Sequence, residues 1–303
     1  MCGVAGIKYK HGPGPLGRDI LEILLGINHR GPDSSGMALY GEPLPSGRVQ
    51  LRARLDSPAD SPEQEAGAEA LAEAIRTTGA TVLGCTISGD ACLVEMESCP
   101  SLKDLANRLR DLPGVELQSG GAILEIMKAV GPADELDRQF GVRERMGTHG
   151  VGHVRLATES QILVSTSHPF WAFGFPDVAV VHNGQLTNYY RLRRWLESRG
   201  WKFATQNDTE LIAIYVADKL DQGYSLRETL EQSLKDFDGT FSCIVSTADE
   251  IGFAKDMLGA KPLVVAETED MILLASEEVG IQRVVHDPNL ITVEPYPLEV
   301  QTW

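Results

Sequence analysis

Cys2 directly follows the initiator methionine, and this position makes its thiol a candidate nucleophile. Removal of an initiator Met is favoured when the next residue is small, as Cys is. The mature chain would then carry a thiol and a free α-amine on one residue. Because an α-amine has a pKa of about 7.7–8.0, a useful fraction is neutral at cellular pH and can accept the thiol proton. Such a pair is suited to amide hydrolysis. Taken alone, Cys2 is better explained as simply a small residue after Met.

Seven short polar segments further along the chain decide between these interpretations. They are residues 29–36 (HRGPDSSG), 152–158 (GHVRLAT), 167–169 (SHP), 182–184 (HNG), 207–210 (NDTE), 255–263 (KDMLGAKPL) and 275–277 (ASE). Together with the opening MCGVAG, and in this order, they resemble the class II glutamine amidotransferases, which are N-terminal-nucleophile hydrolases. The resemblance covers nearly everything except residues 46–130. It implies that Cys2 is the nucleophile that attacks the side-chain amide of L-glutamine.

The resemblance also implies how glutamine, a zwitterion with a neutral amide at its far end, would be bound. Arg155 would pair with the α-carboxylate through two parallel hydrogen bonds, with Thr158 adding a hydroxyl. Asp208 would bind the α-ammonium. Without the resemblance, each residue has another interpretation. Arg155 would be a surface arginine, and Asp208 would be a plain N-cap of the helix that follows it.

The oxyanion formed by attack on an amide needs preorganised hydrogen-bond donors. By resemblance these are the side-chain amide of Asn183 and the backbone N–H of Gly184. The alternative for this pair is an ordinary hairpin turn, since Asn-Gly is a common turn sequence. Arg30, with Gly31 beside it, is expected to order the loop around the Cys2 main chain rather than take part in the chemistry.

The chain departs from better-known members of the family at two positions that border the substrate pocket. Leu156 stands where many have Trp or Tyr, and Glu159 stands where some have His. These changes bear on the fine geometry of the pocket and not on the class of reaction. Four histidines fall in the matched segments, but the resemblance implies no metal, and their spacings fit no pair of metal ligands. The sequence therefore predicts no metal site.

Three segments narrow the resemblance to stand-alone glutaminase subunits of glutamate-synthase-like complexes, including N-methylglutamate synthase. They are residues 148–153, 157–160 and 293–297. Since the chain ends at Trp303, soon after the last match, we expect a partner synthase subunit to use the ammonia. By resemblance the partners would carry FMN and an iron–sulfur cluster. This chain has neither a phosphate-binding glycine loop nor cluster cysteines, so we expect no cofactor on it.

Two other functions stay open at this stage. One is an N-terminal-cysteine hydrolase of another γ-glutamyl amide, which would bind the same glutamyl head group. The other is a catalytically silent subunit that senses glutamine or acts as a scaffold. The presence of the nucleophile together with the matched binding residues argues against the silent subunit.

Charge and cysteine content exclude several classes of protein. Asp and Glu outnumber Lys and Arg by 43 to 27, which argues against nucleic acid or an anionic membrane surface as a partner. No apolar stretch approaches the roughly 18 residues of a membrane-spanning helix. The five cysteines are odd in number and irregularly spaced, so they fit neither a disulfide framework nor a zinc site. Reduced thiols in the cytoplasm are expected, with Cys85, Cys92 and Cys243 as inert core residues.

Hydrophobic periodicity predicts a mixed α+β protein. The expected strands are residues 4–8, 37–40, 150–157, 178–183, 240–246, 263–266 and 271–275, and the two main helices of the C-terminal part are residues 192–198 and 208–222. Given the resemblance, residues 2–45 and 131–303 form one discontinuous catalytic domain, an N-terminal-nucleophile hydrolase sandwich with layers in the order α/β/β/α.

Residues 46–130 are expected to form a small inserted α+β subdomain. Its predicted elements follow the order β-α-β-β-α-β, which is the ferredoxin-like split pattern. The segment contains no catalytic motif. We therefore regard it as a candidate docking surface for a partner subunit.

Overall fold

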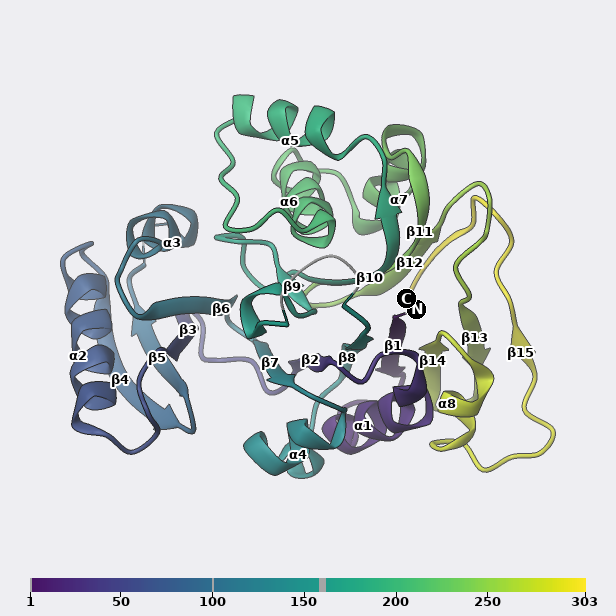
Figure 1. The fold of residues 1–303 in the computed structure, drawn as a ribbon, viewed down its shortest axis with the longest axis horizontal. Helices are drawn as coiled ribbons and strands as arrows, with labels where there is room; N and C mark the ends of the chain where they lie inside the picture. The colour runs from purple at the N-terminus through teal and green to yellow at the C-terminus, as the bar shows by residue number, and fades with distance from the viewer. Residues whose placement is uncertain (1, 100, 158–161) are drawn as a thin grey trace.

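The computed structural model describes residues 2–99, 101–157 and 162–303. Two antiparallel sheets pack face to face (Figure 1). The seven-stranded sheet has the order β15 (Thr292–Val293), β13 (Val264–Glu267), β14 (Met271–Ala275), β1 (Gly3–Tyr9), β8 (His149–Arg155), β2 (Ser34–Tyr40) and β7 (Leu124–Val130). The five-stranded sheet has the order β16 (Val300–Thr302), β12 (Ile251–Lys255), β11 (Gly239–Ser246), β10 (Ala179–Leu186) and β9 (Phe170–Trp171).

Helices cover both outer faces of the sheet pair (Figure 1). The seven-stranded sheet is covered by α1 (Leu16–Gly26), α4 (Asp134–Phe140) and α8 (Glu278–Gln282). The five-stranded sheet is covered by α5 (Tyr189–Ser198), α6 (Asp208–Asp221) and α7 (Leu226–Asp236). The four layers therefore confirm the predicted α/β/β/α sandwich. None of the helices in the described ranges is both long and apolar enough to cross a membrane.

Apolar side chains fill all three spaces between these four layers. Successive residues of a strand point to opposite faces, so Val4 of β1 enters the core between the sheets while Ala5 packs toward α1. In the same way, Ile244 of β11 faces the other sheet while Val245 faces the helices α5–α7. Because both faces of these strands are buried, the sequences of the central strands are continuous apolar runs, without polar residues at alternate positions.

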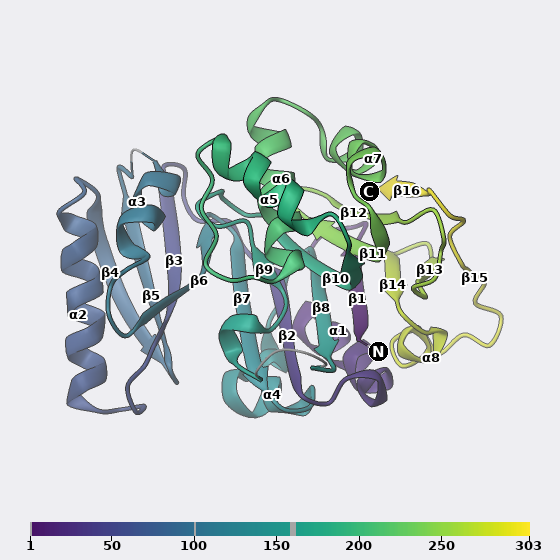
Figure 2. The same ribbon diagram turned by 45° about the horizontal axis from the view of Figure 1, so that its top comes forward.

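The segment after β2 forms a separate four-stranded antiparallel sheet, which Figure 2 shows beside the sandwich. Its elements are β3 (Arg48–Leu55), α2 (Pro62–Arg76), β4 (Thr81–Ser88), β5 (Ala91–Glu97), α3 (Leu102–Leu109) and β6 (Val115–Gly121). The strands lie in the order β4-β5-β3-β6, so the first and third strands of the unit are central. This is the ferredoxin-like arrangement that the β-α-β-β-α-β order predicted.

The end of this inserted unit differs from the sequence interpretation. The strand β7, residues 124–130, was assigned to the insertion, yet it pairs along its whole length with β2, from Ser34↔Val130 to Tyr40↔Leu124. It also resembles a sandwich strand in burying both faces, since Ile126 packs between the sheets and Met127 packs toward the helices. The inserted sheet itself therefore ends with β6.

Two further expectations need correction. The C-terminal part contains a third main helix, α7, which the sequence analysis did not include. Its signal was present, because Ser225 and Glu228 form a capping box at its start. Among the cysteines expected in the core, Cys92 and Cys243 are buried, but Cys85 is exposed. The reason is that β4 is an edge strand of the inserted sheet, so its apolar run does not mark burial.

Candidate active site

Cys2 lies just before β1, at the end of the central strand of the seven-stranded sheet. The register pairs Gly3 of β1 with Val154 of β8, which places Cys2 beside Arg155 at the ends of two neighbouring strands. The Cys2 Sγ lies 3.8 Å from the carbonyl oxygen of Leu156. The side chain is partly exposed, so the thiol remains accessible. Strand pairing thus brings together two residues that are 153 positions apart in the printed sequence.

The main chain of Cys2 is held from two sides. Its carbonyl oxygen accepts hydrogen bonds from Arg30 Nε at 2.9 Å and from Asn183 Nδ2 at 3.1 Å. Arg30 is 8% exposed, and its guanidinium also pairs with the Glu277 carboxylate. His29 binds the second oxygen of that carboxylate at 3.0 Å. Arg30 therefore lies against the Cys2 main chain and is itself held by a residue that the sequence interpretation did not include.

Gly31 lets this loop lie flat against the end of β8. A Cβ at this position would lie 2.4 Å from the carbonyl carbon of Arg155, so a larger residue would push the loop away. Asp33 strengthens the same contact, because its carboxylate accepts a hydrogen bond from the backbone N–H of Ala157 at 2.8 Å. The loop and the strand end are thus fixed relative to each other.

Asn183 and Gly184 lie within β10 and not in a hairpin turn. Their partners across the ladder are Ser242 and Phe241 of β11. Gly184 has a φ of +147°, and a Cβ here would lie 2.0 Å from the carbonyl oxygen of Thr240. Only glycine fits this position. The turn interpretation is therefore excluded, and the Asn183 amide points across the sandwich toward Cys2.

Asp208 opens α6 but does not cap it. The N-cap is Asn207, whose side chain accepts from the backbone N–H of Thr209. The Asp208 carboxylate instead accepts from the Leu186 N–H at 3.1 Å and lies 3.5 Å from His182 Nδ1. Burial alone would raise the pKa of this carboxyl, but His182 and the backbone donors more than offset it, so the pKa is lowered overall. A charged carboxylate is thus maintained beside β10 without a capping role.

Three buried histidines lie between Asp208 and the seven-stranded sheet. The rings of His153 and His168 are in contact at a tilt of 35°, with centroids 4.0 Å apart, and His153 Nε2 lies 3.0 Å from the carbonyl oxygen of His182. The hydroxyl of Thr209 lies 3.2 Å from both His182 Nδ1 and His168 Nε2. Burial lowers the pKa of His153 to about 3 and that of His168 well below its usual range. These two rings are therefore neutral at physiological pH.

Arg155 is 6% exposed, unlike a surface arginine. Its Nη1 donates to Thr166 Oγ1 at 3.4 Å. Burial lowers the pKa of the guanidinium, while Cys2 and Asp33 act in the opposite direction. The neighbouring Leu156 is 37% exposed. Thr158 and Glu159, which the sequence analysis placed at the pocket, lie outside the described residues.

The arrangement therefore brings together a partly exposed thiol, an amide donor, a buried guanidinium and a partly buried carboxylate. A thiol beside an amide N–H can add to a carbonyl, and the two opposite charges can hold the two ends of a zwitterion. The supporting residues Glu277, His182 and Thr209 were not predicted as part of the site. Their signal was that each lies in a segment carrying the family resemblance. Within residues 2–99, 101–157 and 162–303, no group of three His, Cys, Asp or Glu residues is arranged to hold a metal ion.

Comparisons with known proteins agree along nearly the whole chain. A family model described as a glutamine amidotransferase domain matches residues 153–283. A putative glutamine amidotransferase of Methanothermobacter thermautotrophicus is 38% identical over 306 residues, which cover 99% of this chain and 99% of the relative. The glutamine amidotransferase-like protein GlxB of Rhizobium meliloti is 32% identical over 310 residues, covering 100% of this chain and 98% of that protein.

Among solved structures, the glutamine phosphoribosylpyrophosphate amidotransferase of B. subtilis shares the fold. It matches with a TM-score of 0.62 and 20% sequence identity. The match covers 99% of this chain but 47% of that structure, so the chain spans about half the length of the solved relative. At this identity the likeness concerns the fold and not the substrates.

Proposed function

The chain belongs to the class II glutamine amidotransferases, and we propose that Cys2, freed by removal of Met1, is its nucleophile toward L-glutamine. The observation that carries the proposal is the pair of hydrogen bonds on the Cys2 carbonyl oxygen. Arg30, in the loop between α1 and β2, and Asn183, on β10 of the five-stranded sheet, reach this atom at 2.9 and 3.1 Å. They hold the N-terminal residue in place next to the donor that an oxyanion would need.

The proposed reaction proceeds through a thioester. The α-amine of Cys2 takes the thiol proton, and Sγ adds to the side-chain amide carbon of glutamine. Asn183 has two N–H donors on its amide, so one can remain on the Cys2 carbonyl while the other binds the oxyanion, together with the Gly184 N–H. Collapse of the adduct breaks the C–N bond, and the leaving nitrogen takes the proton from the α-amine and departs as ammonia. Water then hydrolyses the thioester, which releases glutamate and restores the thiol.

The glutamine head group would be held by Arg155 and Asp208. The buried guanidinium of Arg155 offers two parallel hydrogen bonds to the α-carboxylate. The carboxylate of Asp208, whose pKa is lowered by its surroundings, stays charged and can pair with the α-ammonium. We assign Thr158 an additional hydroxyl contact with the substrate. Because both ends of the head group are bound, a short or uncharged amide should be a poor substrate.

We further propose that the ammonia passes to a synthase subunit of the glutamate-synthase or N-methylglutamate-synthase type. The match covers 47% of the solved relative, so about half of that structure lies outside the part that resembles this chain. The two relatives with high coverage are, by contrast, of similar length to this chain. In this proposal the chain carries no cofactor, and any flavin or iron–sulfur cluster belongs to the partner. The five free cysteines support a reducing, cytoplasmic location.

The nucleophile is tested by glutamate release from glutamine, with the N-terminal mass measured in parallel. We expect activity in a protein whose mass lacks Met1, and none in Cys2→Ala. Cys85→Ala is a matched control, because it removes an exposed thiol far from the site. Equal activity of Cys2→Ala and the wild type would refute the assignment.

The partner is tested by co-expression with glutamate-synthase-type subunits. Product formation is then measured with glutamine and, separately, with ammonium salts. Cys2→Ala should abolish the glutamine-dependent reaction and leave the ammonia-dependent one intact. Failure of the subunits to co-purify would contradict the partner proposal without affecting the glutaminase assignment.

A further inference from the structure

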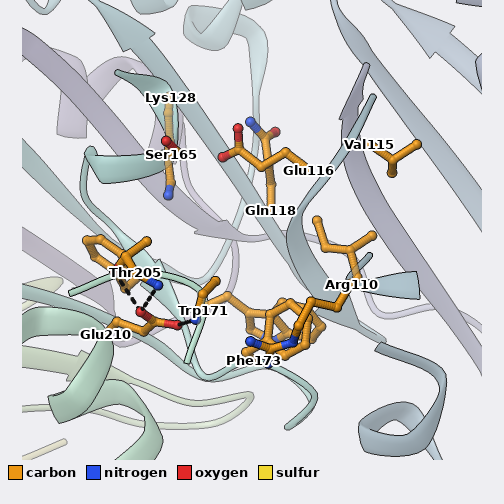
Figure 3. A pocket seen from close by; sticks show the side chains of 13 residues that line it. Arg110, Val115, Glu116, Gln118, Lys128, Ser165, Trp171, Phe173, Thr205 and Glu210 are labelled. Carbon is orange, nitrogen blue, oxygen red and sulfur yellow. Dashed lines mark hydrogen bonds between the residues drawn. The ribbon is translucent and has the colours of Figure 1, made fainter. Parts of the chain in front are cut away.

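The inserted unit meets the sandwich on the β6 side of its sheet. A cavity of about 160 Å³ marks this junction, with walls from α3 and β6 of the insertion and from β7 and β9 of the sandwich (Figure 3). Burial lowers the pKa of Lys128 in this wall to about 8, and the charges of Glu116 and Glu210 act in the opposite direction, so cation and anions lie together there. The other edge of the inserted sheet is β4, which lies away from the sandwich (Figure 1 and Figure 2).

Two cysteines share one face of the hairpin at this outer edge. Across the β4–β5 ladder, Cys85 pairs with Val94, and Ile87 pairs with Cys92. Partners across a ladder point to the same side of the sheet, and so do alternate residues of one strand. Cys85 on β4 and Cys92 on β5 are therefore diagonal neighbours on the same face.

The two thiols lie closer together than ordinary packing requires. Cys85 Sγ is 2.7 Å from Cys92 Sγ, and both cysteines are free. Non-bonded carbon atoms pack at roughly 3.5–4.0 Å, and sulfur is the larger atom. Because the sulfurs of a disulfide lie about 2.05 Å apart, these two would need to approach by less than about 1 Å to form a bond.

The turn of the hairpin is held by its neighbours in the inserted unit. Gln64 Nε2, on α2, donates to the carbonyl oxygen of Gly89 at 2.6 Å. The backbone N–H of Leu55 donates to the carbonyl oxygen of Asp90 at 2.8 Å, and Arg54 Nε donates to the Asp90 carboxylate at 2.9 Å. The turn is thus anchored to α2 and to β3, so the fold itself keeps the two sulfurs side by side.

The two thiols differ in their access to solvent. Cys85 is exposed, whereas Cys92 is 0% exposed. Burial raises the pKa of the Cys92 thiol, and Cys85 acts in the same direction. A solute therefore meets Cys85 first, and Cys92 is left to react with the sulfur beside it. Redox-sensing cysteines often have this arrangement, in which an accessible thiol lies next to a second one that resolves the first adduct.

We propose that Cys85 and Cys92 form a reversible disulfide when the protein meets a small-molecule disulfide such as oxidised glutathione. The Cys85 thiolate attacks one sulfur of the oxidant, whose S–S bond breaks, and one glutathione leaves. Cys92 then attacks Cys85 Sγ, which forms the bond between the two cysteines and releases the second glutathione. Two protein thiols are oxidised, one small disulfide is reduced to two thiols, and the two protons pass from the cysteines to the leaving sulfurs.

The bond would tie the edge strand β4 to β5 and would involve neither Cys2 nor the residues proposed to bind glutamine. Glutathione and thioredoxin keep cytosolic thiols reduced, so the disulfide would form under oxidising conditions and be reversed afterwards. A cross-linked hairpin opens less often, so the amide hydrogens of β4 should exchange more slowly with solvent. The inference does not depend on the proposed glutaminase function.

The test uses the full chain with Cys2→Ala, so that the N-terminal thiol does not compete. The protein is equilibrated with oxidised glutathione and alkylated, and its peptides are analysed by mass spectrometry. We expect a cross-link between Cys85 and Cys92 in a protein that is lighter by two hydrogen atoms. A further change, Cys92→Ala, removes the second step, so glutathione should stay attached to Cys85. Cys99→Ala is the matched control, because it removes a partly buried thiol of the same unit and should leave the cross-link intact.

The contribution of the fold is measured by repeating the equilibration in urea. Unfolding frees the two cysteines from their fixed arrangement, so the equilibrium constant for the cross-link should fall by about tenfold or more. Equal constants in the folded and unfolded chain would overturn the proposal. So would glutathione that stays on Cys85 while Cys92 is present, a cross-link to Cys99 instead, or no reaction at either cysteine. Glutamate release is not among these measurements, so failure of the proposed glutaminase activity is distinguishable from failure of this inference.

Discussion

Two glycines at the candidate site of the sandwich are crowded, whereas the turn glycines of the inserted unit stand in open space. In the sandwich, a Cβ on Gly184 would lie 2.0 Å from a carbonyl oxygen, and one on Gly31 would lie 2.4 Å from a carbonyl carbon. In the inserted unit, Gly79, Gly89 and Gly114 all have a positive φ, but a Cβ on any of them would meet no atom within 4 Å. At these three positions glycine serves a turn, whereas Gly31 and Gly184 permit the close packing that forms the site.

The two regions also differ in their histidines. The inserted sheet, residues 48–121, contains none, whereas the sandwich buries His149, His153, His168 and His182. Each of the last three has one ring nitrogen without a hydrogen-bond partner among the described residues. Such groups cost free energy in a fold that has no use for them. The three histidines all lie at the candidate site, so the sandwich carries this cost where its site is built.

Replacing matched glycines should show the largest difference between the two regions. Gly184→Ala should abolish glutaminase activity and cost more than about 4 kcal/mol of unfolding free energy, because the new Cβ overlaps the Thr240 carbonyl. Gly89→Ala in the β4–β5 turn should cost only about 1 kcal/mol, from the positive φ alone. Urea denaturation measures both. Similar losses at the two positions would contradict the comparison.

Acid should destabilise the sandwich through its buried histidines. Burial lowers the pKa of His149 to about 4 and that of His153 to about 3, from an ordinary value of 6.5. Between those limits the unfolded chain binds more protons than the folded one, so stability falls as the pH falls. Each histidine contributes about 1.4 kcal/mol per pH unit in this window. Urea midpoints at pH 7 and pH 5 measure the total.

A pair of histidine variants isolates this effect. His149→Gln should reduce the pH dependence of stability below pH 6.5 by the share of one histidine. His286→Gln, at an exposed position, should leave it unchanged. An unaltered slope in His149→Gln would show that the buried ring does not titrate on unfolding.

Loss of the proposed oxyanion donor should reduce turnover more than stability. Asn183→Ala removes the amide that now binds the Cys2 carbonyl at 3.1 Å, and we expect kcat to fall by about 10²- to 10³-fold. The KM for glutamine should change little, since the donor acts mainly in the transition state. A rise in KM with kcat unchanged would instead indicate a role in substrate binding.

The proposed head-group carboxylate should show the opposite kinetic pattern and a smaller effect. Asp208→Asn removes one charge, and the KM for glutamine should rise by about tenfold to a hundredfold. Asp221→Asn is a matched control, because it changes the exposed last residue of the same helix. If both variants raised the KM equally, the rise would come from the change in the protein's overall charge and not from loss of a contact with the substrate.

Local periodicity and short motifs were sufficient to predict many of the secondary-structure elements of this protein. The strand over residues 271–275 and the helix over residues 208–222 were predicted closely, and the β-α-β-β-α-β order of the insertion was read correctly. All of these depend on residues close together in the chain, where spacing alone carries the information.

Only the tertiary structure decided the features that join distant segments. Arg30 and Glu277 pair across 247 positions, Asn183 reaches Cys2 across 181, and β7 joins β2 rather than the insertion. The same holds for Lys128, which in the sequence is one lysine of a strand but in the fold is a buried cation facing a cavity between two units. The physical reason is that burial and charge pairing are set by which surfaces meet in the folded chain, and spacing along one strand does not specify the surface on the other side.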